Sequence, residues 1–164
     1  MDIQFLSPAE IYGLRKQGIR VVAEAAGSVP GVVHPVKGGI RTLHGALSTV
    51  IDVDWLDVLA AVAWVETKGD AMAVSPTGAL GLFQLTQPIW WETEPALNPF
   101  DWRASSRRAR DVLEGYFNRA EGSSGDPLGV ALRAYKEGWV GAKRHPDRAA
   151  TYHEAVLQAM ASLG

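Results

Sequence analysis

The sequence WVET at residues 64–67 ends an apolar run, and SPTGALGLFQ at residues 75–84 follows it. On a helical period the carboxylate of the first segment, Glu66, shares a face with Leu59, Val62 and Ala63, whereas Ala61 points elsewhere. Burial disfavours the charged form of a carboxyl group and raises its pKa, as a general acid requires near neutral pH. The segment therefore indicates a candidate acid, and the alternative is a helix-end residue that faces solvent.

The second segment combines a turn with a glycine-spaced loop. Pro76 and Gly78 stand at positions typical of a β-turn. Gly81 lets the backbone approach a ligand closely, and the Gln84 amide can both donate and accept hydrogen bonds. An ordinary turn is the alternative interpretation of this segment alone. Together, the two segments suit a site in which one buried glutamic acid protonates a glycosidic oxygen.

The composition of the chain excludes several classes of function. Its 164 residues suffice for one domain, and 47% hydrophobic and 21% charged residues are ordinary for a globular protein. The absence of cysteine excludes disulfides and thiol nucleophiles, and the net charge of −2 gives no footprint for nucleic acid. No apolar run approaches the ~18 residues that span a bilayer, and residues 1–4 lack the basic start of a signal peptide. We therefore expect a soluble chain, without stable membrane insertion, that is not exported by the usual route.

Local signals predict a mostly helical chain. Helices are expected over residues 7–18, 41–50, 54–68, 103–120 and 127–137, near residue 88, and from 146 almost to the end. Asp54 is the expected N-cap of the helix at 54–68, and Gly69 is its expected stop. The Gly- and Pro-rich residues 27–39 predict a loop or a small hairpin. The predicted class is mostly α, or α+β with a minor β-hairpin.

Four short motifs in order resemble the soluble lytic transglycosylases, which share the lysozyme-like fold with goose-type lysozymes. The family's Glu-Ser, its Gly-Leu-Met-Gln, its Ala-Tyr-Asn followed by Gly, and its late tyrosine correspond here to Glu66-Thr67, Gly81-Leu82-Phe83-Gln84, Ala134-Tyr135-Lys136-Glu137-Gly138 and Tyr152. Each motif is short, but their order across residues 58–156 makes the resemblance specific. It implies a lysozyme-like catalytic domain over residues 51–164. Residues 1–50 are then an N-terminal helical and loop extension, which either completes this domain or docks it onto a larger assembly.

The resemblance also implies a reaction, that of a peptidoglycan lytic transglycosylase. Glu66 would protonate the oxygen of the β-1,4 bond between N-acetylmuramic acid (MurNAc) and N-acetylglucosamine (GlcNAc). It would then act as base on the C6 hydroxyl, which closes a 1,6-anhydro ring on the MurNAc. The partner is the glycan strand, and no metal or organic cofactor is needed. The implied substrate-binding residues are Thr67, Ser75, Gly81, Gln84, Tyr135, Lys136 and Tyr152, with the Tyr152 hydroxyl bonding to the Glu66 carboxyl.

Lys136 departs from the family, which has asparagine at this position. A lysine there either binds the carboxylates of the peptide stem or pairs with Glu66 and lowers its pKa, which would weaken the acid. It is also the one feature that favours a cell-wall-binding structural module whose catalytic site has decayed.

A muramidase that adds water is the other alternative, and such enzymes often use a second carboxylate across the cleft. The candidates Asp70, Glu92, Glu94 and Asp101 have no distinguishing spacing, which favours the lyase. Without a signal peptide a wall enzyme needs another route. We therefore expect delivery by a phage virion, a lysis system or an envelope-spanning secretion machine.

Three further groups of residues are weaker candidates. Trp90 and Trp91 either stack on sugar rings or pack in the core. The histidines at 34, 44, 145 and 153 lack metal-ligand spacing. The arginines at 107, 108 and 110 are interpreted as a solvated face of the long helix.

Overall fold

The computed structural model describes residues 39–91 and 97–164, which form seven helices. The helices are α2 (Gly39–Leu47), α3 (Val53–Thr67), α4 (Gln87–Trp91), α5 (Trp102–Glu121), α6 (Pro127–Glu137), α7 (Gly141–Arg144) and α8 (Pro146–Ala161). Within these residues, β structure is limited to two isolated bridges, Val74 with Leu80 and Leu80 with Leu85. The predicted mostly α class is confirmed. The helix predicted at 7–18 and the hairpin predicted at 27–39 lie outside the described residues, apart from Gly39, which begins α2.

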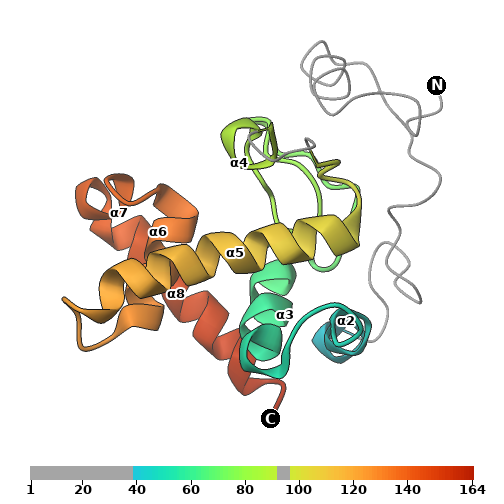
Figure 1. Ribbon diagram of the computed structural model, residues 1–164, viewed down its shortest axis with the longest axis horizontal. Helices are drawn as coiled ribbons and strands as arrows, with labels where there is room; N and C mark the ends of the chain where they lie inside the picture. Colours follow the sequence, from blue (N-terminus) through green and yellow to red (C-terminus); the bar gives the residue numbers. More distant parts are fainter. Residues whose placement is uncertain (1–38, 92–96) are drawn as a thin grey trace.

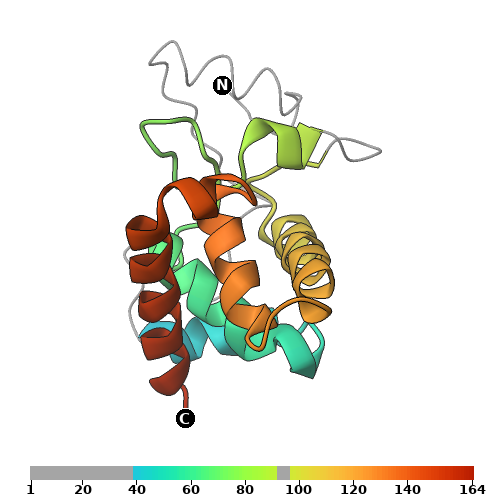
Figure 2. The same ribbon diagram turned by 90° about the vertical axis from the view of Figure 1, so that its left-hand side faces the viewer.

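Helix α3 lies at the centre of the domain. It packs against α2 and α8, and α5 crosses it (Figure 1). Helix α6 packs against both α5 and α8 (Figure 2). Every residue from Leu59 to Ala63 is fully buried, because neighbours cover α3 on all sides. Ala61, which the helical period places off the face of Glu66, is therefore buried as well.

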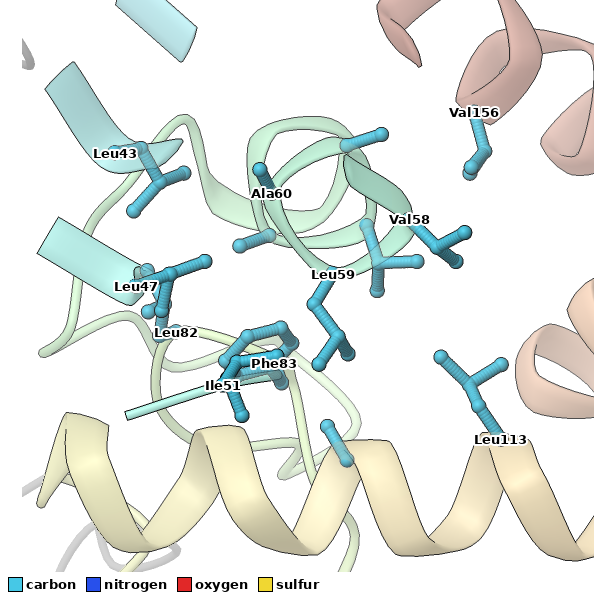
Figure 3. Close-up of a cluster of buried hydrophobic side chains, with 14 of the residues drawn as sticks. Leu43, Leu47, Ile51, Val58, Leu59, Ala60, Leu82, Phe83, Leu113 and Val156 are labelled. Carbon is cyan, nitrogen blue, oxygen red and sulfur yellow. The ribbon is translucent and has the colours of Figure 1, made fainter. Parts of the chain in front are cut away.

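The core fills the space between α3 and its neighbours. Leu43 and Leu47 of α2 approach α3 from one side, and Val156 of α8 and Leu113 of α5 approach it from the other (Figure 3). Phe83, from the loop after α3, joins the same cluster. Burying each such side chain contributes about 1.5–3 kcal/mol. The core therefore fixes the glycine-spaced loop against the helix that carries Glu66.

Side-chain caps start two of the later helices. Asp101 accepts hydrogen bonds from the backbone N–H groups of Arg103 and Ala104 at 3.0 and 3.3 Å, at the start of α5. Asp126 accepts one from the N–H of Gly129 at 3.1 Å, at the start of α6. Such caps satisfy N–H groups that the first turn of a helix leaves unpaired.

The start of α3 differs from its prediction. The helix begins one residue earlier than expected, and Asp52 stands at its N-cap in place of Asp54. The Asp52 side chain makes no capping hydrogen bond and instead accepts one from Arg110 Nε of α5 at 2.6 Å. The other end follows the prediction more closely, since Lys68 and Gly69 leave the helix with positive φ angles of 55° and 88°.

The loop between α3 and α4 is fastened to the helix by the residue next to Glu66. The Thr67 hydroxyl donates to the Leu82 carbonyl at 2.9 Å and to the Ala63 carbonyl at 3.2 Å. These contacts place the Gly81–Gln84 motif beside the end of α3.

Hydrogen bonds within the loop fix its shape. The N–H of Gly81 donates to the Ala73 carbonyl at 2.8 Å. The predicted turn at residues 75–78 is present, with the N–H of Gly78 donating to the Ser75 carbonyl at 3.0 Å. These bonds hold the loop in a defined shape against the end of α3.

Candidate active site

One cleft brings the predicted motifs together. It has a volume of about 510 Å³ and is lined by the end of α3, the loop after it, and residues of α4, α5 and α6. Glu66 lies in its wall, as do Ser75 and Gln84 from the loop and Tyr135 and Lys136 from α6. The wall also includes Tyr116, Glu137 and Gly138.

Glu66 is the candidate acid of this cleft. Its side chain is half-buried at the C-terminal end of α3, and this burial raises the pKa of the carboxyl above its ordinary value. The charge of Lys136, and then the hydroxyl of Tyr152, lower the same pKa by less than burial raises it. The carboxyl therefore stays protonated to a higher pH than that of a free glutamate. The alternative of a solvent-facing Glu66 does not fit this geometry.

Tyr152, from α8, interacts with Glu66 without lining the cleft. It is 5% exposed, and its buried hydroxyl has no hydrogen-bond partner of ordinary geometry in the described part of the chain. Burial and the charge of Glu66 raise the pKa of Tyr152 well above its ordinary value, so the hydroxyl remains a donor. The hydrogen bond expected between the two groups is thus not closed in this structure, although each affects the pKa of the other.

Tyr135 ties α6 to the loop. Its hydroxyl donates to the Phe83 carbonyl at 2.7 Å, while the residue itself forms part of the cleft wall. Burial, followed by the charge of Glu66, raises the pKa of Tyr135 well above its ordinary value, so the hydroxyl keeps the proton that it donates. Tyr135 therefore holds two walls of the cleft at a fixed separation.

Gln84 and Ser75 present polar groups that are partly engaged. Gln84 has a positive φ of 54°. Its side-chain Nε2 donates to the Gly81 carbonyl at 3.0 Å, and its amide oxygen takes no part in this bond. Ser75 Oγ accepts from the N–H of Ala79 at 2.9 Å and shapes the turn. Of the two, Gln84 is the better placed to meet a ligand.

Thr67 and Gly81 support the site without lining the cleft. The Thr67 hydroxyl donates its hydrogen to the backbone carbonyls of Ala63 and Leu82 and so fastens the loop to α3. A Cβ at Gly81 would come 1.9 Å from the carbonyl oxygen of Pro99. Glycine is therefore required here for contact between two backbone segments, whereas the sequence suggested close approach of a ligand.

Lys136 lies near Glu66 but is not paired with it. Among the described residues Lys136 forms no ion pair, and its Nζ lies over the Tyr152 ring, 5.5 Å from the centroid. Of the two roles predicted for this lysine, a direct pair with Glu66 is absent, although its charge still lowers the Glu66 pKa.

The sequence analysis missed Glu137, a second carboxylate in the cleft wall. Its side chain is 13% exposed and accepts a hydrogen bond from Arg148 Nη2 at 3.2 Å. Glu137 directly follows Lys136 in the third motif, and this position was the signal from which a second carboxylate could have been predicted. Both residues stand at the end of α6 and line the same cleft. Of the carboxylates that were considered, Asp101 caps α5, Asp70 accepts from the N–H of Met72, and neither lines the cleft.

The remaining candidates lie away from the cleft or outside the described residues. Trp90 is fully buried, so it packs in the core and does not stack on sugars. Arg108 donates to the Ile89 carbonyl, and Arg110 binds Asp52. Residues outside the description are the histidine at 34 and the glutamates at 92 and 94.

Neither a cluster of metal ligands nor a membrane-spanning helix is found among the described residues. No three His, Cys, Asp or Glu side chains gather there as ligands for a metal ion. None of the helices found there is both long enough and apolar enough to cross a bilayer.

The family model described as "Transglycosylase SLT domain" matches residues 51–150, and the chain belongs to this family. The family has a lysozyme-like fold, acts on peptidoglycan, and its members are typically lytic transglycosylases. No curated protein and no solved structure matched the chain. Delivery by a virion, a lysis system or a secretion machine stays a prediction.

Proposed function

We propose that the chain is a peptidoglycan lytic transglycosylase in which Glu66 is both acid and base. The protonated carboxyl gives its proton to the glycosidic oxygen, the bond from MurNAc C1 to that oxygen breaks, and GlcNAc leaves with the proton. The Glu66 carboxylate then takes the proton of the MurNAc C6 hydroxyl while that oxygen bonds to C1. The product is a 1,6-anhydro ring, the acid is restored, and no water is consumed.

One observation carries this proposal: Glu66 is a half-buried carboxyl with a raised pKa in the wall of a cleft of about 510 Å³. The acid step needs a carboxyl that keeps its proton to a higher pH than a free glutamate does, and desolvation shifts the pKa of Glu66 in this direction. The sugar's own N-acetyl group can stabilise the positive charge at C1, as in substrate-assisted glycosidases. In this scheme the unpartnered Tyr152 hydroxyl orients the Glu66 carboxylate after the proton has left.

The mass of the products tests the reaction. Purified peptidoglycan digested with the full chain should release muropeptides that end in 1,6-anhydroMurNAc, each one water lighter than its reducing-end counterpart. Mass spectrometry of the digest separates the two products, and a heat-denatured sample gives the background. Products with reducing ends would replace the lyase assignment with that of a muramidase.

Glu137 is the observation that favours the muramidase as second candidate. A hydrolase needs a base to activate water, and Glu137 is the other carboxylate among the lining residues described. The hydrogen bond that it accepts from Arg148 Nη2 fixes the position of its carboxylate in the cleft wall.

The variant Glu137→Gln separates the two mechanisms. For a lyase we expect anhydromuropeptide release within about threefold of wild type, because Glu66 supplies both proton transfers. For a hydrolase, removing the base should cost about a hundredfold or more. Arg148→Gln is the matched control, since it removes the partner of Glu137 and leaves the carboxylate in place.

A variant of Lys136 should move the pH dependence of catalysis. The acid must be protonated, so kcat/KM falls on the alkaline side as Glu66 ionises. Lys136 lowers the Glu66 pKa, and Lys136→Met should therefore raise it and move the alkaline limb to higher pH. The measurement is kcat/KM across pH for wild type, Lys136→Met and Lys136→Arg, and the last variant should keep the wild-type limb. An unmoved limb in Lys136→Met would remove Lys136 from the control of Glu66.

A further inference from the structure

Two exposed cations flank an aromatic ring beyond one end of the cleft. Arg119, near the end of α5, places its guanidinium carbon 4.0 Å from the centroid of the Trp139 ring. Lys143 of α7 places its Nζ 5.9 Å from the same centroid. Figure 1 shows the end of α5 beside α6 and α7. We call Arg119, Trp139 and Lys143 the cationic end.

The cationic end is continuous with the cleft. The Trp139 ring stacks on Tyr116, with centroids 6.0 Å apart and an interplanar angle of 18°. Tyr116 lines the cleft, and so does Gly138, the neighbour of Trp139 in the chain. A polymer that fills the cleft therefore reaches the two cations when a substituent extends past Tyr116.

Within the described part of the chain, no ion pair neutralises the positive charge of this region. Among the described residues, neither Arg119 nor Lys143 forms an ion pair, whereas Arg110 and Arg148 do. The full chain carries a net charge of −2, so these cations do not reflect a generally basic surface. Cations on an aromatic face are held in place by about 0.5–1 kcal/mol at exposed sites, and their remaining hydrogens are free to meet an anion.

We propose that the cationic end binds carboxylates of the peptide stem that MurNAc carries. This inference rests on the proposed function for its substrate. The stem leaves the glycan strand sideways from the lactyl group and bears free carboxylates, so it is the anionic part of the strand that extends out of a cleft. The contact should favour stem-bearing over stem-free strands, and salt should weaken it because both cations are exposed.

Binding in the Glu66→Gln background tests the proposal without turnover. Soluble stem-bearing glycan strands are titrated by calorimetry into this variant and into the same variant with Arg119→Gln and Lys143→Gln added. We expect the added pair to raise Kd roughly fivefold, as for two exposed charge contacts, and about 0.5 M salt to abolish the difference. Arg107→Gln, an exposed arginine on α5 away from the cleft lining, is the matched control and should leave Kd unchanged.

Two chemically altered strands identify the source of the carboxylate. On strands whose carboxyl groups are converted to amides, the pair of substitutions should have no effect. Strands stripped of their stems keep a lactyl carboxylate, and on these too we expect no effect; a fivefold loss there would assign the site to the lactyl group and overturn the proposal. An unchanged Kd on stem-bearing strands would also overturn it.

A conservative variant separates charge from packing. Arg119→Lys with Lys143→Arg keeps both charges and should bind stem-bearing strands like the parent, whereas a loss equal to that of the glutamine pair would indicate a packing role for Arg119 on Trp139. Failure of the proposed function would appear elsewhere, as continued turnover by Glu66→Gln.

Discussion

Glu66→Gln should lower the rate of anhydromuropeptide release by at least about a thousandfold. A positioned general acid or base contributes about 10²–10⁴-fold, and Glu66 is proposed to supply both proton transfers. The glutamine keeps the size and polarity of the side chain but can neither give nor take the proton. The measurement is kcat from single-turnover digests with saturating enzyme, which excludes effects on binding.

The matched control is Glu154→Gln, the same chemical change at an exposed position of α8. It should keep wild-type kcat. Residual activity of Glu66→Gln within tenfold of wild type would mean that another group is the acid. If wild type and Glu66→Gln bind strands equally and neither turns over, the chain is a wall-binding module whose catalytic site has decayed, the alternative that Lys136 suggested.

The same variant should change how stability depends on pH. The pKa of Glu66 is raised in the folded chain, so the folded state binds the proton more tightly than the unfolded state does. The contribution of this group to the free energy of unfolding is therefore fully present below its pKa in the unfolded state. It is lost as pH rises through its pKa in the folded state. Glu66→Gln removes that loss, so its free energy of unfolding should exceed that of wild type most clearly at alkaline pH. Urea titrations at acidic and alkaline pH check this difference.

Most helices of this fold were predictable because their signals are local. Asp101 and Asp126 cap α5 and α6, since an aspartate accepts the N–H groups of the next turn whatever the rest of the chain does. Asp52, and not the predicted Asp54, stands at the N-cap of α3. Its side chain makes no capping hydrogen bond because a distant residue, Arg110, binds its carboxylate. Helix α7, with four residues, was missed because so short a segment has no periodicity to detect.

The candidate site was predictable in its members but not in their roles. The motifs indicated Glu66, and the structure adds the burial that raises its pKa. Thr67 was expected to hold sugars because it stands where the family has the serine of its first motif, but its hydroxyl donates to the carbonyl of Leu82, fifteen residues away in the chain. Glu137 was missed because which face of α6 lines the cleft depends on how that helix packs against α5 and α8.

Gly81→Ala should lower the free energy of unfolding by about 2–5 kcal/mol. Gly81 has a φ of 78°, where a residue with a Cβ costs about 1–2 kcal/mol. The added Cβ would also lie 1.9 Å from the Pro99 carbonyl oxygen, so one backbone segment must move, and overpacking of this kind costs about 1–3 kcal/mol. For a chain of this size the melting temperature should fall by about 10 °C.

The loss should extend to catalysis, because Gln84 donates to the Gly81 carbonyl and leaves the cleft wall when the loop shifts. Gly115→Ala is the matched control: this glycine lies inside α5 with open space around its Cβ position. Alanine there should stabilise the chain by about 0.5–1 kcal/mol, since it favours the helix without a clash. Urea unfolding of both variants compares the same chemical change in opposite surroundings. Equal effects at the two positions would mean that the contact between Gly81 and Pro99 does not hold the loop, and that the Gly81–Gln84 motif is fixed by Thr67 and the core alone.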